Sequence, residues 1–455
     1  HSHAYSHTYT HAGVPDLPAA DSKELPVAGN KRTEGTEGPV PSIPSVPSNP
    51  LHFPIHLVRL LRHPGLRVPL QHPRPPQRPQ AGAQGRIVAQ PAKLGGQAGD
   101  VAFARNQAVA SAHSLTQSGM PAADVALFDD LRIDLDFAGA RALPRLRESI
   151  AAHVGVGADA VLLALGASGA MHQLALVLFR PGVRVVTEIP SYEPLRALPR
   201  RAGAEVREVV RSIDDGWRID VAQVARALEG SRKGHIFITT PHNPSGATTD
   251  ANTLRELAEL AARHNGYLIS NEIYLEFAPP ERAVRAVHLA PNAISIGSLT
   301  KAYGLGPLRI GWIALGSLPA QRRAEFEDSL YLDYVDAPTT TLNAGQRAFE
   351  CLPSLRAPIE KIERESKPVF VDWLARARGV RATLPAMGLI AFAHLEGVDD
   401  TLALQRFLAS EHGVAVTPGE YFGSPGYVRL GFGTPRTQLA EALARFERGL
   451  AAFRS

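Results

Sequence analysis

Lys301 and Arg309 stand eight residues apart, between two apolar runs of the chain. Lys301 follows the run 293–298, and a lysine at the end of a buried strand loses its proton more easily because burial disfavours the charged form. Such an amine can form a Schiff base with a carbonyl group. The hydroxyls of Ser298 and Thr300, with the Arg309 guanidinium, would form an anion pocket beside it. A reactive amine next to a phosphate pocket indicates pyridoxal 5'-phosphate (PLP).

The same residues allow two other interpretations. A surface lysine beside a structural arginine would need no ligand. The pattern Ser298-x-x-Lys301 is also typical of the serine-nucleophile penicillin-binding proteins, but their S-D-N and K-T-G motifs are missing from this chain. We therefore favour the cofactor-binding lysine.

Three further motifs follow apolar runs in a fixed order. Residues 239–246 read T-T-P-H-N-P-S-G, residues 271–274 read N-E-I-Y, and residues 427–432 read Y-V-R-L-G-F. Together with the lysine and arginine above, this ordered set resembles the class I/II aminotransferases of PLP fold type I, over residues 107–455. The resemblance implies an enzyme that moves an amino group between an α-amino acid and a 2-oxo acid through a Lys301 Schiff base.

Residues 166–170 join a predicted strand to a predicted helix. Backbone N–H groups at such a helix N-terminus, with the Ser168 hydroxyl, can hold a phosphate. In the family the residues that match Ala167 and Ser168 cradle the cofactor phosphate; the alternative is an ordinary turn with Ser168 as the N-cap. Tyr192 matches the aromatic residue that stacks on the cofactor ring, and the alternative is a tyrosine of the core.

Asn243 and Tyr274 match the two residues that hydrogen-bond the phenolic oxygen of the cofactor. Tyr274 is thereby the second catalytic candidate after Lys301. Pro244 restricts Asn243 to extended backbone, which fixes the direction of its amide. A turn asparagine and a core tyrosine are the alternatives.

Arg429 lies in the middle of an apolar run, where an arginine needs an anion. In the family the matching arginine clamps the α-carboxylate of the substrate with two parallel N–H groups. A buried ion pair with a glutamate is the alternative. Gly119 matches a residue whose backbone N–H reaches the same carboxylate.

Asn271 departs from the family pattern, which is Asp-Glu-x-Tyr. The aspartate keeps the pyridine nitrogen of the cofactor protonated, which makes the ring an electron sink. An amide has no charge to hold that proton, and losing a buried ion pair disfavours the protonated ring by roughly several kcal/mol at most. Three interpretations stay open: a slow aminotransferase, an enzyme for other fold-type-I chemistry such as elimination or decarboxylation, and a PLP-binding protein with impaired turnover.

Phe137 is a second departure, because the family has a tyrosine there whose hydroxyl reaches the phosphate of the neighbouring subunit. Phenylalanine keeps the ring but cannot make that bond. The resemblance implies a homodimer with active sites shared across the interface.

The composition fits a soluble globular protein. Hydrophobic residues make up 44% and charged residues 20% of the 455 positions, which allows a large core. The net charge of +4 is small, and the chain has no helix-turn-helix or zinc-ligand spacing, so we expect neither a nucleic-acid partner nor a metal. A single cysteine, Cys351, fits a reducing compartment and hence the cytoplasm. No apolar run approaches the ~20 residues that span a bilayer.

The first hundred residues hold 16 of the 37 prolines and 8 of the 17 histidines. Such a segment cannot bury much apolar surface, which predicts a disordered extension over residues 1–95. The resemblance divides the rest into an N-terminal segment of the small domain at 96–130, a large PLP-binding domain at 131–318 and a small C-terminal domain at 319–455.

Strand-like runs alternate with helical patterns, which predicts an α/β fold with a mostly parallel sheet covered on both faces. The predicted strands are 161–165, 184–189, 204–210, 235–240, 267–272, 293–298 and 310–315, and the predicted helices are 168–179, 221–228 and 254–264. Helices at 324–333, 342–350, 359–377, 402–410 and 439–453, with strands at 389–393, 414–417 and 427–433, predict a smaller α+β domain. Ligands of parallel sheets bind at the carboxyl ends of strands, where these motifs lie.

Overall fold

The computed structural model describes residues 111–133, 142–333 and 337–455. The predicted extension at 1–95 and the departure at Phe137 lie outside these residues. Within them, no helix is both long and apolar enough to cross a membrane.

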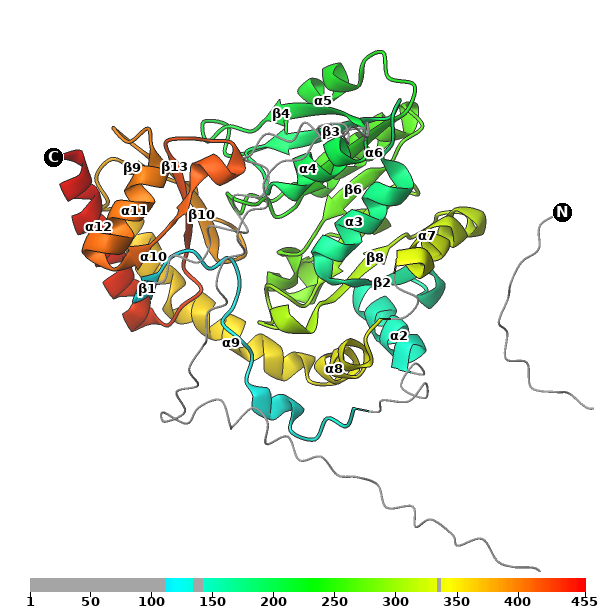
Figure 1. Ribbon diagram of the computed structural model, residues 1–455, viewed down its shortest axis with the longest axis horizontal. Coiled ribbons are helices and arrows are strands. Elements are labelled where there is room, and N and C mark those ends of the chain that lie inside the picture. Colours follow the sequence, from blue (N-terminus) through cyan, green and yellow to red (C-terminus); the bar gives the residue numbers. More distant parts are fainter. Residues whose placement is uncertain (1–110, 134–141, 334–336) are drawn as a thin grey trace, which may run out of the picture. The chain divides into compact units, whose positions relative to one another are not determined.

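A seven-stranded sheet carries most of the motifs (Figure 1). Its strands are β2 (Val161–Leu165), β3 (Arg184–Ile189), β4 (Glu205–Val210), β5 (Gly234–Thr239), β6 (Leu268–Asn271), β7 (Ala293–Ser298) and β8 (Ile310–Ala314). They lie in the order β2-β8-β7-β6-β5-β3-β4. All neighbours run parallel except β8, which is antiparallel to both β2 and β7. The prediction of a mostly parallel sheet is therefore confirmed.

Helices cover both faces of this sheet, because successive side chains of a strand point to opposite faces. The helices of this region are α2 (Ala142–Val154), α3 (Gly166–Leu178), α4 (Pro194–Arg201), α5 (Val221–Leu228), α6 (Ala251–Arg263) and α7 (Ala320–Asp333). In β5, Phe237 belongs to the same core cluster as Leu174 of α3. Its neighbours Ile236 and Ile238 belong to a second cluster with Leu254 of α6. Successive side chains of β5 therefore belong to the cores on opposite faces of the sheet, as expected for a sheet covered on both faces.

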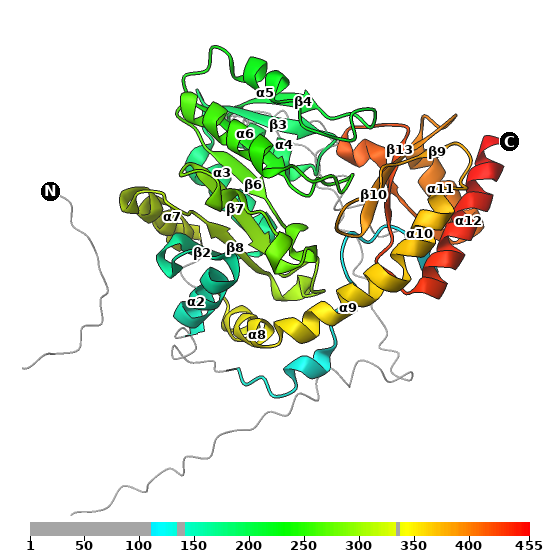
Figure 2. The ribbon, with the colours of Figure 1, turned by 180° about the vertical axis from the view of Figure 1, so that it is seen from behind.

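The C-terminal part has its own small sheet, of order β12-β13-β10-β9 with antiparallel pairs. Its strands are β9 (Val380–Arg381), β10 (Ile390–Leu395), β12 (Thr417–Pro418) and β13 (Tyr427–Gly431), and a parallel pair joins β1 (His113–Ser114) to β11 (Val414–Ala415). The helices are α8 (Thr339–Glu350), α9 (Leu352–Glu365), α10 (Lys367–Leu374), α11 (Thr401–His412) and α12 (Arg436–Arg454). Figure 2 shows α11 and α12 packed beside this sheet.

Short 3-10 turns connect the longer elements. They are η2 (Val125–Phe128), η4 (Ala158–Ala160), η5 (Leu275–Phe277), η6 (Pro280–Arg282), η7 (Ala286–His288), η8 (Gly306–Leu308) and η9 (Gly419–Phe422). Two of them adjoin motif residues, because η5 directly follows Tyr274 and η8 directly precedes Arg309.

Helix α3 begins at Gly166, two residues before the predicted start at 168. Ser168 therefore lies in the first turn, and the alternative that it caps the helix is wrong. Leu165 occupies the cap position and makes no side-chain cap bond. The first N–H groups of this helix are left for another acceptor.

The helix predicted over 359–377 is two helices, α9 and α10, that meet at Ser366. Pro368 lies inside the predicted range. Proline has no N–H to donate to the preceding turn, and its ring clashes with that turn. The apolar spacing is continuous through this point, so the pattern alone did not reveal the break.

Candidate active site

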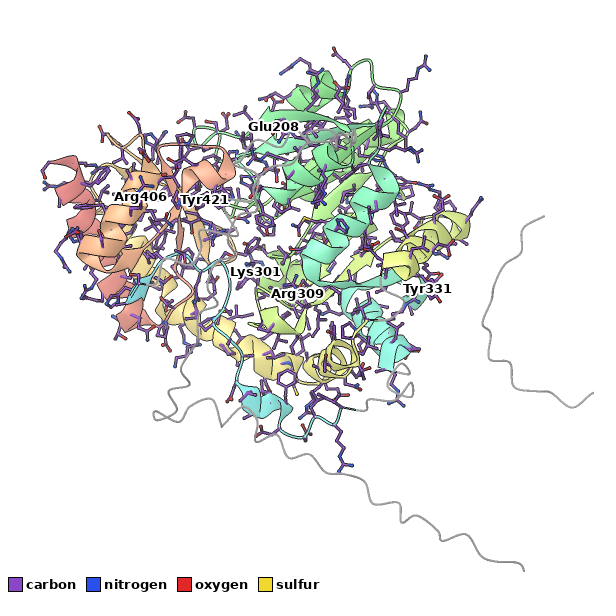
Figure 3. All side chains as sticks on the ribbon, in the orientation of Figure 1. Glu208, Lys301, Arg309, Tyr331, Arg406 and Tyr421 are labelled. Atoms are coloured by element: carbon purple, nitrogen blue, oxygen red, sulfur yellow. The ribbon has the colours of Figure 1, made fainter. Side chains whose placement is uncertain are left out.

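A cavity of about 190 Å³ lies at the carboxyl ends of β5, β6 and β7, against the first turn of α3 and strand β13. The residues that line it are Ser118, Ala167, Ser168, Met171, Tyr192, Thr239, Asn243, Asn271, Ile273, Tyr274, Thr300, Lys301, Arg309 and Arg429. Figure 3 places Lys301 and Arg309 between the large sheet and the C-terminal sheet. The fold thus brings together the sequence-predicted site residues, except Ser298 and Gly119.

Lys301 follows β7 and its amine lies inside the cavity, where Nζ donates a hydrogen bond to Ser118 Oγ over 2.8 Å. Burial lowers the pKa of Lys301 to about 8, and the positive charges of Arg429 and Arg309 act in the same direction. A group with this pKa is partly an uncharged amine near neutral pH, and only the uncharged amine is nucleophilic.

Arg309 lies against the start of α3. Its Nη2 donates to the Leu165 carbonyl oxygen over 3.1 Å, and its backbone adopts a left-handed conformation with φ of 53°. A side chain at Gly166 would put a Cβ only 2.5 Å from that Nη2 atom, and one at Gly311 would come within 2.6 Å of the Gly166 backbone. Both glycines are therefore needed for the Arg309 guanidinium to reach the N-terminus of α3. The charge of the guanidinium and the dipole of the helix both give this place a positive potential.

Tyr192 lies just beyond the end of β3 and lines the cavity. Burial raises the pKa of its phenol, while a hydrogen bond with Ser168 acts in the opposite direction. That bond ties the aromatic side chain to the first turn of α3. An aromatic ring held in this way can cover one face of a flat ligand.

Arg429 of β13 is 1% exposed and reaches the cavity from the C-terminal sheet. Its Nη1 donates to Asn243 Oδ1 over 3.1 Å and its Nη2 donates to the Thr116 carbonyl over 2.9 Å. The guanidinium also lies over the Phe422 ring, 5.2 Å from its centre. These contacts fix the orientation of the planar guanidinium group, whose paired N–H groups have the geometry that carboxylate binding needs.

His242 holds the loop that carries Asn243. Its Nε2 donates to the Pro190 carbonyl over 2.7 Å, so its Nδ1 accepts from the Ser245 hydroxyl, also over 2.7 Å. Burial, and then the charge of Arg211, lower the pKa of His242 well below its usual value. The neutral ring therefore links the end of β3 to the end of β5 without adding charge to the cavity.

Asn271 ends β6 with its carboxamide buried in the cavity wall. Its Nδ2 donates to Met171 Sδ over 3.7 Å, and its buried Oδ1 has no hydrogen-bond partner among the described residues. The next residue, Glu272, points away and accepts from Ala286 N and Ser295 Oγ. Burial raises the pKa of Glu272 to about 7, against the nearby charge of Arg285.

The family model "Aminotransferase class I and II" matches residues 112–446. The chain belongs to the class I and II aminotransferases. Capreomycidine synthase of Streptomyces vinaceus is 31% identical to it over 339 residues, which cover 73% of this chain and 86% of that protein. Arginine–pyruvate transaminase of Pseudomonas aeruginosa is 31% identical over 299 residues, 64% of this chain and 74% of that protein.

The fold is that of solved aminotransferases. The structure of a PLP-dependent aminotransferase from Streptococcus suis matches with a TM-score of 0.70 at 24% identity, over 78% of this chain and 98% of that one. Aspartate aminotransferase from Thermus thermophilus with maleate matches with a TM-score of 0.65 at 24% identity, over 78% of this chain and 97% of that one. The predicted PLP fold type I is confirmed.

Aminotransferases of this family use PLP, and the cavity of this chain fits that cofactor. Three buried polar atoms in its wall, Thr239 Oγ1, Asn271 Oδ1 and the Tyr274 hydroxyl oxygen, have no hydrogen-bond partner within the described ranges. Buried polar atoms without a protein partner indicate a ligand that supplies one. Arg309 and the first turn of α3 offer positive potential for a phosphate, and Lys301 offers the amine for an aldehyde.

Two predicted residues lie outside the cavity wall. The Ser298 hydroxyl donates to the Ile310 carbonyl and lies 2.7 Å from Thr300 Oγ1, so it supports the turn instead of lining the cavity. Gly119 packs against the main chain of Lys301, where a Cβ would lie 2.6 Å from the Lys301 carbonyl oxygen. Its role toward a carboxylate stays a prediction.

Four cavity residues were not predicted: Ser118, Met171, Thr239 and Ile273. Thr239 and Ile273 lie within the motifs 239–246 and 271–274, so their position at strand ends was a signal for a place in the cavity wall. Met171 belongs to the apolar face of α3, where its spacing indicates only a core residue. Ser118 has no sequence signal of its own, because its partner is 183 residues away.

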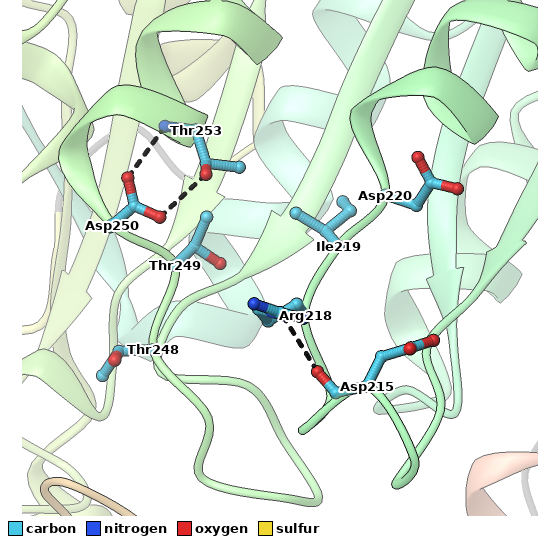
Figure 4. A pocket seen from close by; sticks show the side chains of 8 residues that line it. All are labelled: Asp215, Arg218, Ile219, Asp220, Thr248, Thr249, Asp250 and Thr253. Carbon is cyan, nitrogen blue, oxygen red and sulfur yellow. Dashed lines mark hydrogen bonds between the residues drawn. The ribbon is translucent and has the colours of Figure 1, made fainter.

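A second hollow, of about 310 Å³, lies between the starts of α5 and α6 (Figure 4). Its acidic side chains already serve the protein. Asp250 accepts from Asn252 N and Thr253 N at the start of α6, and Asp220 accepts from Ala222 N in the same way at the start of α5. These are helix caps, so we assign this hollow no chemistry.

Proposed function

We propose that this aminotransferase moves an amino group between an α-amino acid and a 2-oxo acid with Lys301 as the lysine that holds PLP covalently at rest. The observation that carries the proposal is the Lys301 amine, buried in one cavity with Arg309 on one side and Arg429 on the other. Arg309, with Ala167 and Ser168, binds the cofactor phosphate. Bound PLP supplies an aldehyde that takes up the amino group and a ring that delocalises the electrons left by the Cα–H bond.

The other cavity residues bind the cofactor and fix its orientation. Tyr192 covers one face of the ring, and Asn243 and Tyr274 hydrogen-bond its phenolic oxygen. Thr300 supports the phosphate site beside Arg309. Once the substrate amine has displaced Lys301, the free Nζ of Lys301 takes the proton from Cα. A base whose pKa lies near the working pH is best suited to this transfer.

Arg429 binds the substrate α-carboxylate with the second N–H groups of Nη1 and Nη2, since each of these nitrogens donates only one of its two hydrogens to Asn243 or Thr116. The printed names of the relatives include an arginine–pyruvate transaminase and an aspartate aminotransferase, whose substrates differ in side-chain charge. The proposal therefore extends to α-amino acids as a class and does not select a side chain.

A half-reaction experiment tests the proposed function. The PLP-loaded chain is mixed with a panel of L-amino acids while cofactor absorbance and products are followed. We expect at least one amino acid to yield its 2-oxo acid and the amine form of the cofactor in equal amounts. Release of ammonia or of carbon dioxide would point to elimination or decarboxylation, and no reaction across the panel would contradict amino transfer.

Asn271→Asp is expected to raise the rate of Cα proton removal at least tenfold, about 1.4 kcal/mol of barrier. A carboxylate at this position holds a proton on the pyridine nitrogen, which the Asn271 amide cannot do by charge. Single-turnover rates and cofactor spectra of both proteins check this. If neither the rate nor the spectrum changes, Asn271 does not contact the ring, and a slower reaction of the variant would indicate chemistry that does not need a protonated ring.

The proposal includes a homodimer located in the cytoplasm. The support for the dimer is the family resemblance, and the support for the compartment is the use of one cysteine in 455 residues. Sedimentation of the PLP-loaded chain at micromolar concentration is expected to show a dimer. A monomer alone under those conditions would contradict a site shared between subunits.

A further inference from the structure

Ser118 contacts the reactive amine of this site from a different part of the chain. It lies in the segment before η2, is 7% exposed, and its Oγ accepts the hydrogen bond from Lys301 Nζ over 2.8 Å. Hydrogen bonds to a charged donor are among the stronger ones in proteins. The amine is therefore held at a defined place when it is not bonded to a ligand.

The residues next to Ser118 hold the main chain of the same lysine. Met120 N donates to the Lys301 carbonyl over 2.7 Å. Gly119 lies so close to Lys301 that a Cβ there would be 2.9 Å from its Cα atom. The backbone of this segment and the backbone of the lysine turn cannot move independently, so the hydroxyl of Ser118 is positioned rigidly toward Nζ.

The segment is also tied to the strand that carries Arg429. Gly431 N donates to the Leu115 carbonyl over 2.7 Å, and Arg429 Nη2 donates to the Thr116 carbonyl over 2.9 Å. Residues 115–120 therefore connect the arginine assigned to the substrate carboxylate with the lysine assigned to the Cα proton.

We propose that Ser118 is a positioning residue for the free amine of Lys301, holding Nζ in place for proton transfer after the substrate has displaced it. This proposal rests on the proposed function, in which Lys301 alternates between a bonded and a free amine. Ser118 does not itself take the proton in this step. Its hydroxyl accepts from Nζ and limits the positions that the long lysine side chain samples.

The charges around Lys301 Nζ determine how the Ser118 hydroxyl affects the pKa of this amine. Arg429 from β13 and Arg309 from the turn after η8 both disfavour the ammonium form, in addition to burial. Ser118 is a neutral acceptor that stabilises the ammonium more than the amine, so it opposes these effects. Removing its hydroxyl is expected to lower the pKa of the free Lys301 amine further.

Tyr274 is the third group at this point. Burial raises the pKa of Tyr274, while the charge of Arg429 and the nearby Ser118 hydroxyl act against the shift. Ser118 Oγ accepts from Lys301 Nζ, whereas the buried Tyr274 hydroxyl has no hydrogen-bond partner within the described ranges. The phenolic proton of Tyr274 is therefore available to a ligand in the cavity.

Three variants of the 455-residue chain test the proposal: Ser118→Ala, Ser118→Thr and, as a matched control, Ser114→Ala. Ser114 lies in the same segment, and its hydroxyl bonds Thr116 Oγ1 over 2.8 Å. Each protein is loaded with pyridoxamine 5'-phosphate so that Lys301 is free. Competitive acetylation across pH, read by mass spectrometry of the Lys301 peptide, then gives the pKa of that amine.

We expect Ser118→Ala to lower the Lys301 pKa by about one unit and to slow single-turnover Cα proton removal about tenfold. Ser118→Thr keeps the hydroxyl and is expected to restore both values, and Ser114→Ala is expected to leave both unchanged. A Ser118→Ala protein with the pKa and rate of the unaltered chain would overturn the proposal, as would equal effects of all three variants.

The two proposals fail in different ways. If borohydride fixes PLP on Lys301 but Ser118→Ala changes neither value, the role of Ser118 alone is wrong. If PLP is not on Lys301 in the unaltered protein, the proposed function is wrong as well. A Ser118→Ala chain that still takes up PLP on Lys301 shows that the variant is folded.

Discussion

Replacing Lys301 with alanine is expected to slow amino transfer by at least about a thousandfold, because the variant loses both the covalent hold on PLP and the base that removes the Cα proton. The phosphate site at Arg309 and α3 is intact in this variant, so PLP is still expected to bind without a covalent bond. The measurement is the single-turnover rate with the best amino acid of the panel.

Lys361→Ala is the matched control for this experiment, because Lys361 is exposed on α9. We expect its rate to equal that of the unaltered chain. A Lys301→Ala protein that retains more than about a tenth of the rate would mean that another group does this chemistry.

Replacing Arg429 with alanine is expected to lower kcat/KM about a hundredfold or more. Each charge-assisted hydrogen bond contributes about 1.5–3 kcal/mol, and two of them to a carboxylate account for a loss of this size. Arg429→Lys keeps the charge but not the fork, so an intermediate loss is expected. Steady-state kinetics with amino acids of the panel check this.

An amine that lacks the carboxylate separates binding from folding in the Arg429 series. Its reaction is expected to be equally slow in the unaltered and Arg429→Ala proteins, since the arginine has no carboxylate to bind. Arg406→Ala, an exposed position on α11 (Figure 3), serves as the control. A loss with the amine as large as with the amino acid would indicate that Arg429 only supports Asn243 and the main chain at Thr116.

The sequence predicted the parts of the site that follow apolar strands. Lys301 after β7, Asn271 at the end of β6 and Asn243 after β5 meet because parallel strands place their carboxyl ends at one edge. Most strands of the central sheet were predictable because they are largely apolar runs, whereas the edge strand β4 alternates apolar and charged residues, E-V-R-E-V-V.

The contacts that hold these residues were not predictable from local pattern. Ser118 meets Lys301 across 183 positions, and Arg429 meets Asn243 across 186. Ser298 has the residue type of a phosphate ligand, yet its hydroxyl is bonded to the Ile310 carbonyl. Whether a hydroxyl hydrogen-bonds the main chain or a ligand depends on the conformation of the turn that carries it. Sequence spacing alone does not reveal that conformation.

Borohydride reduction followed by peptide mapping tests the central claim most directly. The purified PLP-loaded chain is expected to be yellow, to lose its colour on reduction, and to carry the cofactor on the peptide that contains Lys301. The chain has other lysines, such as Lys233 and Lys367, that serve as internal comparisons. A map that places the reduced cofactor on one of these, or on no lysine, would contradict the account.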